Sequence, residues 1–189
     1  MVEILKYNDD DLKDNEIDQV VTRVKAFIVS SKNNMLIGKD EEGYQLLGGY
    51  VEDNEDYKQA LARHIYSETG IVLDVKDKIE PFFEVRYYNR DYKGSGINRL
   101  SDMIYFLVNT DKLPNYKKLK LSEKELAEKM PLEVIRRSIF HKTLNEYIAS
   151  EQNPLIQVKT KEILLAFEKM KEIYKKKKKK EYLSFSNNF

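Results

Sequence analysis

Three side chains in the stretch RHIYSETG have types and spacing suited to phosphate chemistry. His64, Ser67 and Glu68 are spaced i, i+3 and i+4, so on a helix they project from one face toward a common point. Carboxylates on such a face bind hard divalent cations, and Mg²⁺ prefers one or two carboxylates together with waters and substrate phosphate oxygens. An ion held there offsets the charge of a diphosphate and orients a water for attack on phosphorus. Glu68 is the carboxylate of this set.

The spacing of the surrounding residues resembles the signature of the Nudix hydrolase family, in a MutT-like form. The family's box reads Gly, five residues, Glu, seven residues, Arg-Glu, an aliphatic residue, any residue, Glu-Glu, any residue, Gly and an aliphatic residue. Seven of these nine defined positions match, namely Gly49, Glu55, Arg63, Ile65, Glu68, Gly70 and Ile71. His64 and Ser67 stand where the family has glutamates, so the box is degenerate. The resemblance extends over roughly residues 20–150.

The resemblance implies a role for each matching polar residue. Glu55 and Arg63 are expected to form an ion pair that braces the box loop against its helix, and Gly70 is expected to end that helix. Glu68 and the carbonyl of Gly49 are the expected metal ligands, with Mg²⁺ or Mn²⁺ as the ion.

Related sequences recruit a further acidic residue from another loop. Glu123 and Glu125 rank first here, because the resemblance places the segment LSEKEL beside the nucleotide site. Glu52 and Glu84 are the alternatives. Ser122 and Glu125 also match a capping box, so a purely structural role for Glu125 is equally open.

The two substitutions in the box leave two functions open. Neutral imidazole is a poor ligand for Mg²⁺ and a better one for Mn²⁺ or Zn²⁺, and near neutral pH it can act as a general base. With His64 and Glu68 as catalytic residues, the resemblance predicts metal-dependent attack of water on a nucleoside diphosphate linked to another moiety. The alternative is a catalytically impaired nucleotide-binding or regulatory module, in which the lost carboxylates explain inactivity and His64 is a solvated substitution.

A nucleotide-type substrate needs groups that bind its phosphates and its base. Arg86, Tyr88 and Arg99 flank a predicted strand and loop, where arginines can clamp phosphates and an aromatic ring can stack on a base. The competing interpretation is structural, because aromatic residues in strands more often form cores or cross-strand pairs.

Composition excludes several kinds of site and partner. The 189 residues contain no cysteine and two histidines, which excludes disulfides, thiolate zinc sites and histidine-rich metal sites. No apolar run approaches the ~20 residues of a membrane span and no secretory pattern is present, so we expect no membrane partner and a cytoplasmic location. The net charge of +1 does not indicate a nucleic acid as partner. The run Lys175–Lys180 is typical of a solvated tail, so we do not expect nucleic acid to bind there. The resemblance leaves a homodimer open.

Periodicity predicts a mixed sheet covered by helices. Strands are expected over 2–7, 20–30, 35–39, 71–75, 79–88, 101–109 and 130–136. Helices are expected from an N-cap at Asp53 or Asn54 to Gly70, from Ser122, over 138–150 and over 158–174. With the resemblance, this order of elements predicts an α/β (α+β) fold, a Nudix-like α/β/α sandwich with a mixed β-sheet, plus a C-terminal helix and a basic tail.

The chain is expected to form one domain with additions at its end. Residues 1–19 supply a first strand and an acidic connector to the same domain, and residues 20–150 form the Nudix-like domain. Residues 151–174 carry a helix packed on that domain, and residues 175–189 form a basic flexible tail.

Overall fold

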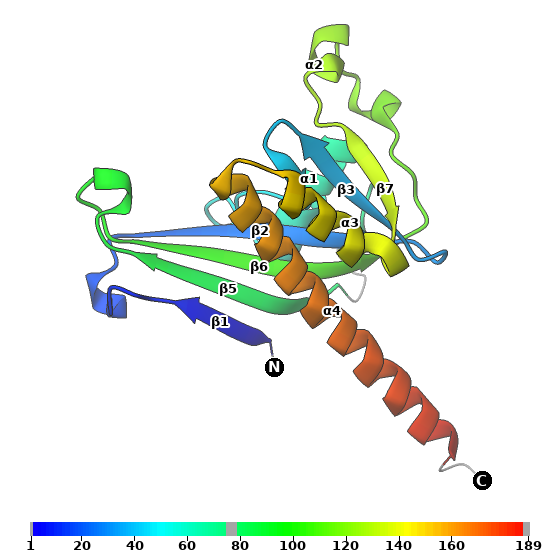
Figure 1. Ribbon diagram of the computed structural model, residues 1–189. Coiled ribbons are helices and arrows are strands. Elements are labelled where there is room, and N and C mark those ends of the chain that lie inside the picture. The colour runs from blue at the N-terminus through cyan, green and yellow to red at the C-terminus, as the bar shows by residue number, and fades with distance from the viewer. Residues whose placement is uncertain (1, 75–78, 187–189) are drawn as a thin grey trace.

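A mixed β-sheet lies at the centre of the molecule (Figure 1). The structure of the protein is a computed structural model that describes residues 2–74 and 79–186, with side chains placed as far as residue 175. Within these residues seven strands join one sheet: β1 Glu3–Tyr7, β2 Gln19–Val29, β3 Asn34–Asp40, β4 Gly43–Gln45, β5 Pro81–Asn89, β6 Arg99–Asn109 and β7 Leu132–Arg136. Their order is β1-β5-β6-β2-β3-β4, with β7 paired to β3. The pairs β1/β5 and β2/β6 are parallel, and the other pairs are antiparallel.

Helices cover both faces of this sheet. The described residues contain the helices α1 Tyr57–Thr69, α2 Glu123–Ala127, α3 Arg137–Ser150 and α4 Pro154–Ser186, and 3-10 turns at Asp14–Glu16, Tyr92–Gly94 and Tyr116–Leu119. α1 packs on one face, and α3 and α4 pack on the other (Figure 1). The fold is therefore the predicted α/β/α sandwich with a mixed sheet. No helix in the described part of the chain is long and apolar enough to cross a membrane.

Strand β2 contributes to the core on both faces. The core under α1 contains Val24, Ala26, Ile28, Leu61 and Ile65. On the opposite face, the ring centroid of Phe27 lies 6.3 Å from that of Phe140 in α3 and 6.2 Å from that of Phe167 in α4. Because helices cover both faces, this part of β2 reads as a continuous apolar run rather than as an alternation.

The box helix begins later than the sequence suggested. Its N-cap is Asp56, whose carboxylate accepts from the amides of Lys58 and Gln59 at 2.8 and 3.0 Å, and not Asp53 or Asn54. Asn54 has a φ of 62° and lies in a turn before the helix. Gly70 ends the helix as predicted, with a left-handed φ of 72°.

The predicted strand over 71–75 is wrong for its described part. Residues 71–74 belong to no strand, and Val75 lies outside the described residues. Ile71 is buried in the core under α1, and Leu73 packs against that core. The apolar alternation there serves the packing of a connecting segment, which periodicity alone does not distinguish from a strand.

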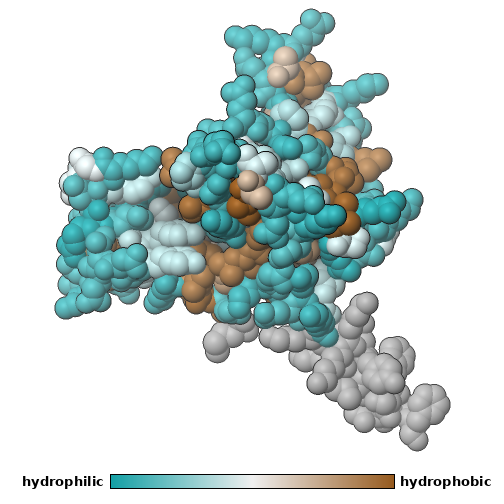
Figure 2. All heavy atoms as spheres, viewed as in Figure 1, coloured by the Kyte–Doolittle hydropathy of each residue, from teal (hydrophilic) through white to brown (hydrophobic). Residues whose placement is uncertain are grey.

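Helix α4 is longer than the predicted 158–174. It begins at Pro154, a residue suited to the first helical turn, and the side chain of Asn153 accepts from the amide of Leu155 at 3.0 Å. The helix continues to Ser186, so its backbone includes the lysine run. On the face shown in Figure 2, hydrophobic side chains gather where α4 crosses the sheet, and most of the remaining area is hydrophilic. The division into a domain and a flexible tail stays a prediction.

We expect Phe167→Ala to destabilise the protein by about 3–5 kcal/mol, because it leaves a cavity among the rings that join α4 to the sheet. Urea unfolding at neutral pH measures the free energy of unfolding. Val158→Ala in the same helix is the control, because Val158 is 60% exposed and we expect a change within about 0.5 kcal/mol. Equal losses in the two variants would show that α4 is not packed as described.

Candidate functional site

The box loop pairs with the first half of β2. The amides of Val24 and Ala26 donate to the carbonyls of Gly49 and Leu47, both at 2.9 Å. Gly48 has a φ of 130°, and a Cβ atom there would lie 2.1 Å from the carbonyl oxygen of Val24. Only glycine therefore lets the loop approach the strand so closely. The carbonyl of Gly49, expected from the sequence to bind a metal, is bonded to the sheet.

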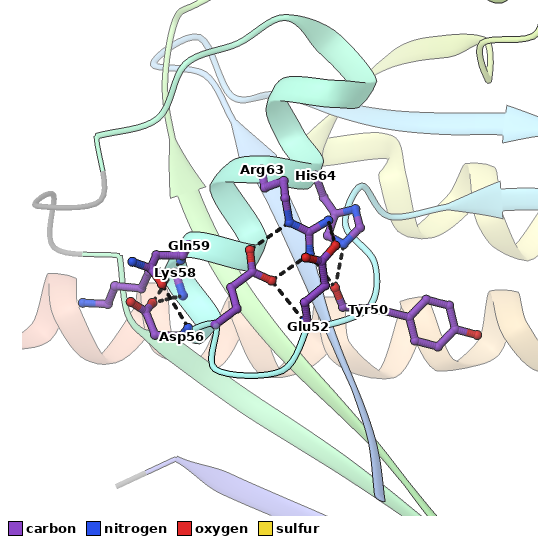
Figure 3. A network of polar contacts seen from close by, with 8 residues as sticks. Tyr50, Glu52, Asp56, Lys58, Gln59, Arg63 and His64 are labelled. Atoms are coloured by element: carbon purple, nitrogen blue, oxygen red, sulfur yellow. Dashed lines mark hydrogen bonds and ion pairs between the residues drawn. The ribbon is translucent and has the colours of Figure 1, made fainter.

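An ion pair ties the box loop to α1 (Figure 3). Arg63 Nε and Nη2 donate to the two carboxylate oxygens of Glu55 at 2.8 and 2.7 Å. Nη2 also donates to the carbonyl of Tyr50 at 3.0 Å, and Nη1 lies 3.3 Å from Glu52 Oε1. The hydrogen bonds from Arg63 lower the pKa of Glu55 to about 2, so the carboxylate is charged at neutral pH. This forked geometry fixes the loop relative to the helix.

His64 packs against the same loop. Its Nε2 lies 2.8 Å from the carbonyl oxygen of Tyr50 (Figure 3). Because a carbonyl only accepts, Nε2 carries a proton, and Nδ1 is the ring nitrogen that can accept one. The ring lies over Gly49, where an added Cβ atom would meet ring atoms at 2.4 to 2.8 Å. Ser67 Oγ donates to the carbonyl of His64 at 2.9 Å, so both substituted positions bond to backbone carbonyls.

A lysine ammonium lies against the carbonyls of the box loop. Lys25 Nζ donates to the carbonyls of Leu46 and Gly48 at 3.0 and 3.2 Å. Glu68 Oε2 accepts from the amide of Gly48 at 3.1 Å, so ammonium and carboxylate contact the same residue. Burial lowers the pKa of Lys25 and raises the pKa of Glu68, while the opposite charge of each group opposes the shift of the other.

The segment expected to supply another metal ligand brings a lysine to the box helix. Glu125 completes the capping box of α2, because its Oε2 accepts from the amide of the N-cap Ser122 at 2.8 Å and its own amide donates to Ser122 Oγ at 3.3 Å. The hydrogen bonds from Ser122 lower the pKa of Glu125. Glu123 lies exposed in the same short helix. Lys129 Nζ donates to the carbonyl of Ser67 at 2.9 Å.

The donors around Glu68 do not fit a divalent metal ion. In residues 2–74 and 79–186, no group of three or more His, Cys, Asp or Glu side chains is placed to hold one. The carbonyl of Gly48, the residue whose amide donates to Glu68, already accepts from the ammonium of Lys25. That positive charge would repel a cation at the same oxygen. The ligand set expected for Mg²⁺ or Mn²⁺ is therefore not assembled.

A pocket of about 630 Å³ opens between the box loop, the sheet and α4. Its cationic residues are Arg23, Lys25 and Lys159, and Lys159 Nζ lies 3.0 Å from Glu42 Oε2. Its tyrosines are Tyr44, Tyr50, Tyr87 and Tyr105. Glu162 of α4 accepts hydrogen bonds from the hydroxyls of Tyr87 and Tyr105, which fixes both rings. The pocket therefore combines positive charge with aromatic surface.

Tyr50 lies at the edge of this pocket between two arginines. Arg23 donates to the Tyr50 hydroxyl, and its guanidinium carbon lies 4.2 Å from the ring centroid. The hydrogen bond from Arg23 lowers the pKa of Tyr50, and the charge of Arg99 adds to this effect. Arg99 also stacks on Tyr92 at 4.3 Å. Of the residues expected to bind substrate, Arg99 is thus placed beside the pocket.

The structure does not bring Arg86 and Tyr88 to this pocket. Side chains alternate along β5, so Tyr87 and Asn89 line the pocket while Arg86 and Tyr88 point to the face that α1 covers. The hydroxyl of Tyr88 donates to Asp14 Oδ1 at 3.3 Å.

Arg86 instead lies between two buried carboxylates. It donates to Glu84, and its Nε lies 3.9 Å from Asp102 Oδ2. Asp102 Oδ1 is buried and has no hydrogen-bond partner among the described residues. Burial, and next the charge of Glu84, raise the pKa of Asp102 to about 7. One arginine therefore offsets only part of the charge of this pair.

The cations of the pocket were missed in the sequence. Arg23 and Lys25 alternate with apolar residues in the strand VVTRVKAFIV, which puts both on one face of β2. Charged residues are rarely buried without a partner, so a lysine in an apolar strand was the available indication of a site. The approach of Lys159 from α4 had no local indication.

We expect Asp102→Asn to stabilise the protein at about pH 8 and to have little effect near pH 4. The folded state keeps a proton on Asp102 up to about pH 7, whereas the unfolded chain releases it near pH 4, so the native carboxyl loses stability as pH rises between these values. The asparagine is neutral throughout. Urea unfolding at about pH 4 and about pH 8 measures the difference.

Asp111→Asn is the matched control with the opposite sign. Hydrogen bonds from Ser31 lower the pKa of Asp111, so its removal should reduce stability above about pH 4. If Asp102→Asn changed the free energy of unfolding equally at both pH values, the raised pKa of Asp102, and with it the burial of Asp102 beside Glu84, would be contradicted.

The family comparison agrees with the box and the fold. A family model described as the NUDIX domain matches residues 19–150. No curated protein matches the sequence.

The chain is similar to several solved structures at low sequence identity. A MutT protein from Methanosarcina mazei Go1 is 19% identical, with 81% of this chain and 96% of that chain covered and a TM-score of 0.46. A MutT protein from Bacillus halodurans is 17% identical over 65% of this chain and 72% of that chain, with a TM-score of 0.46. The dihydroneopterin triphosphate pyrophosphohydrolase of E. coli is 12% identical over 77% of this chain and 95% of that chain, with a TM-score of 0.45. Since the family model matches most of its length, this chain belongs to the Nudix domain family.

Proposed function

We propose that the chain binds a nucleotide-type ligand with a diphosphate in the pocket beside the box loop, and that Lys25 serves there in place of a metal ion. The observation that carries this proposal is the contact of Lys25 Nζ with the carbonyls of Leu46 and Gly48 at 3.0 and 3.2 Å. The ammonium lies where the box motif leads us to expect a divalent cation.

An ammonium provides part of what a divalent ion provides to a diphosphate. It has three N–H donors, and two of them go to the loop carbonyls, which leaves one for a ligand oxygen. Arg23 and Lys159 add positive charge to the same pocket. Charge-assisted hydrogen bonds to phosphate are among the stronger polar contacts. An ammonium does not generate a metal-bound hydroxide, so this arrangement favours binding over hydrolysis.

The tyrosines of the pocket suit the other half of a nucleotide. Stacking on an aromatic ring accepts every base, because each base has a π-face. Tyr50 is 52% exposed, so its ring is the one that a base can reach. Tyr105 is buried and Tyr87 is stacked on Tyr7, and the hydroxyls of both are bonded to Glu162, so this wall of the pocket is ordered before a ligand arrives. A pocket ordered in advance loses less conformational entropy on binding.

Hydrolysis of a nucleoside diphosphate linked to another moiety is the second candidate. Membership in the Nudix family and the retained Glu68 favour it. His64 Nδ1 is available as a proton acceptor, since Nε2 is bonded to Tyr50. This candidate requires the site to be rebuilt from the arrangement described, because Lys25 occupies the loop carbonyls.

We expect no phosphate or nucleoside monophosphate release from nucleotide sugars, dinucleoside polyphosphates, nucleoside triphosphates or ADP-ribose with Mg²⁺ or Mn²⁺. The reason is the missing set of acidic ligands around Glu68. A malachite green assay and chromatography of the products, at high protein concentration, measure release. Metal-dependent turnover that Glu68→Gln abolishes would refute the binding proposal and support the hydrolase.

We expect the best-binding member of that panel to bind equally well in EDTA and in Mg²⁺, and about ten- to hundredfold more weakly to Lys25→Met. Methionine keeps the length of the side chain and removes the ammonium that offsets phosphate charge. Isothermal titration calorimetry measures the dissociation constants.

Lys142→Met on the exposed side of α3 is the control for the loss of one positive charge. Binding that disappears in EDTA, or that is unchanged in Lys25→Met, would contradict the role given to this lysine. Thermal melting of both variants separates lost contacts from lost folding.

A further inference from the structure

A second concave site lies at the start of α3, away from the box loop. It has a volume of about 550 Å³ and is formed by the β2–β3 turn, the junction of β7 with α3, and the part of α4 around Lys171 and Tyr174. Lys159, which lines the nucleotide pocket, is twelve residues before Lys171 on the same helix. At 1.5 Å per residue, the two sites are about 18 Å apart along α4. We call this second site the α3–α4 groove.

The α3–α4 groove is lined by cations from separate parts of the chain. Those with exposed side chains are Lys32 from the β2–β3 turn, Arg136 from β7 and Lys175 from α4. Lys171 also lines it and pairs with Glu168 at 2.7 Å. No Asp or Glu is among the residues that line this groove in the described part of the chain. The fold therefore gathers positive charge that is dispersed in the sequence.

An aromatic ring and a guanidinium form a planar wall of the groove. The guanidinium carbon of Arg137 lies 4.5 Å from the ring centroid of Tyr174. The hydroxyl of Tyr174 donates to Asn109 at 2.9 Å, which fixes the ring. Such planes suit the stacking of an unpaired base, whereas the surrounding cations suit a phosphate.

The groove continues into the lysine run. Lys175 belongs both to the groove and to the run Lys175–Lys180, and α4 continues as one helix to Ser186 (Figure 1). The lysine run of the sequence therefore begins at the groove.

We infer that the α3–α4 groove binds the sugar–phosphate backbone of a single-stranded nucleic acid. The lysine run alone is typical of a solvated tail, but the groove adds fixed cations and a stacking plane beside it. A concave site favours a strand that can enter it over a flat lipid surface, which contacts only the rim. The stacking plane favours unpaired bases over a duplex.

The test uses the full chain and fluorescently labelled single strands of uridylate and of thymidylate, about twelve nucleotides long. Fluorescence anisotropy at several KCl concentrations gives the dissociation constant and its salt dependence. Lys32→Gln with Arg136→Gln removes two exposed cations of the groove. Since each phosphate contact contributes about 0.7 to the log–log salt slope of a single strand, we expect the slope to fall by about 1.4 and binding at about 0.1 M salt to weaken about 25-fold.

The matched control is Lys117→Gln with Lys124→Gln, which removes the same charge from exposed positions near α2. We expect less than a threefold change there, and unchanged melting temperatures for both double variants. Equal weakening in the two double variants would overturn the groove, because net charge alone would then explain binding. The groove would also be overturned if replacing all six lysines by glutamine abolished binding while the groove variant bound like the control.

Two competition arms identify the partner class. Unlabelled single strands of RNA or of DNA should displace the probe, and displacement by either supports the inference. Vesicles with about one third phosphatidylserine, or a duplex of equal length, should compete more weakly at equal phosphate concentration. Stronger competition by vesicles or by duplex overturns it in favour of a membrane surface or a double-stranded partner.

Discussion

The pairing of the box loop with β2 is the constraint on which the functional site depends. The amides of Val24 and Ala26 hold the loop to the strand, and Gly48 permits the close approach. Because strand residues alternate, the side chain between these two amides, that of Lys25, points away from α1 and toward the pocket. Its ammonium then reaches the loop carbonyls from that side. A register shift of one residue in β2 would exchange the lysine for an apolar side chain.

Charges inside this sandwich occur in sets, because an isolated charge between two covered faces is costly. On the pocket side, the charge of Lys25 is opposed by that of Glu68 across the loop. On the side of α1, Arg86 lies between Glu84 and Asp102, and two acids with one arginine leave a proton on the pair to about pH 7. The first set lies beside a pocket that a ligand can enter, whereas both acids of the second set are buried. Location rather than the size of a pKa shift is therefore the basis on which we assign the first set to the proposed binding site.

The sequence predicted the features that local patterns encode, such as helix ends and caps. It missed the contacts that depend on strand register and on packing between distant segments. Gly70 ends α1 and Ser122 caps α2, because glycine favours left-handed backbone and a serine hydroxyl accepts from a helical amide within a few residues. The layers of the fold followed from strand and helix periodicity and from the family resemblance. Arg86 was assigned to the substrate because its face of β5 was unknown, and only the pairing of β5 with β6 places it beside Asp102, away from the pocket. The contact of Lys25 with a loop more than twenty positions later has no local pattern.

His64 and Ser67 reduce the negative charge of the box, and Lys25 of β2 brings positive charge to the same loop, so the two features fit together. Three carboxylates at positions 64, 67 and 68 would concentrate three negative charges, which divalent ions must offset. With His64 and Ser67 in place of two of them, Glu68 is the one carboxylate left, and the ammonium of Lys25 can offset its charge without an ion. Loss of the glutamates without the lysine would leave a partly buried carboxylate beside bare carbonyls. The diphosphate of the proposed ligand would still require positive charge, and the ammonium is placed to supply it, so the arrangement supports the proposed binding over metal chemistry.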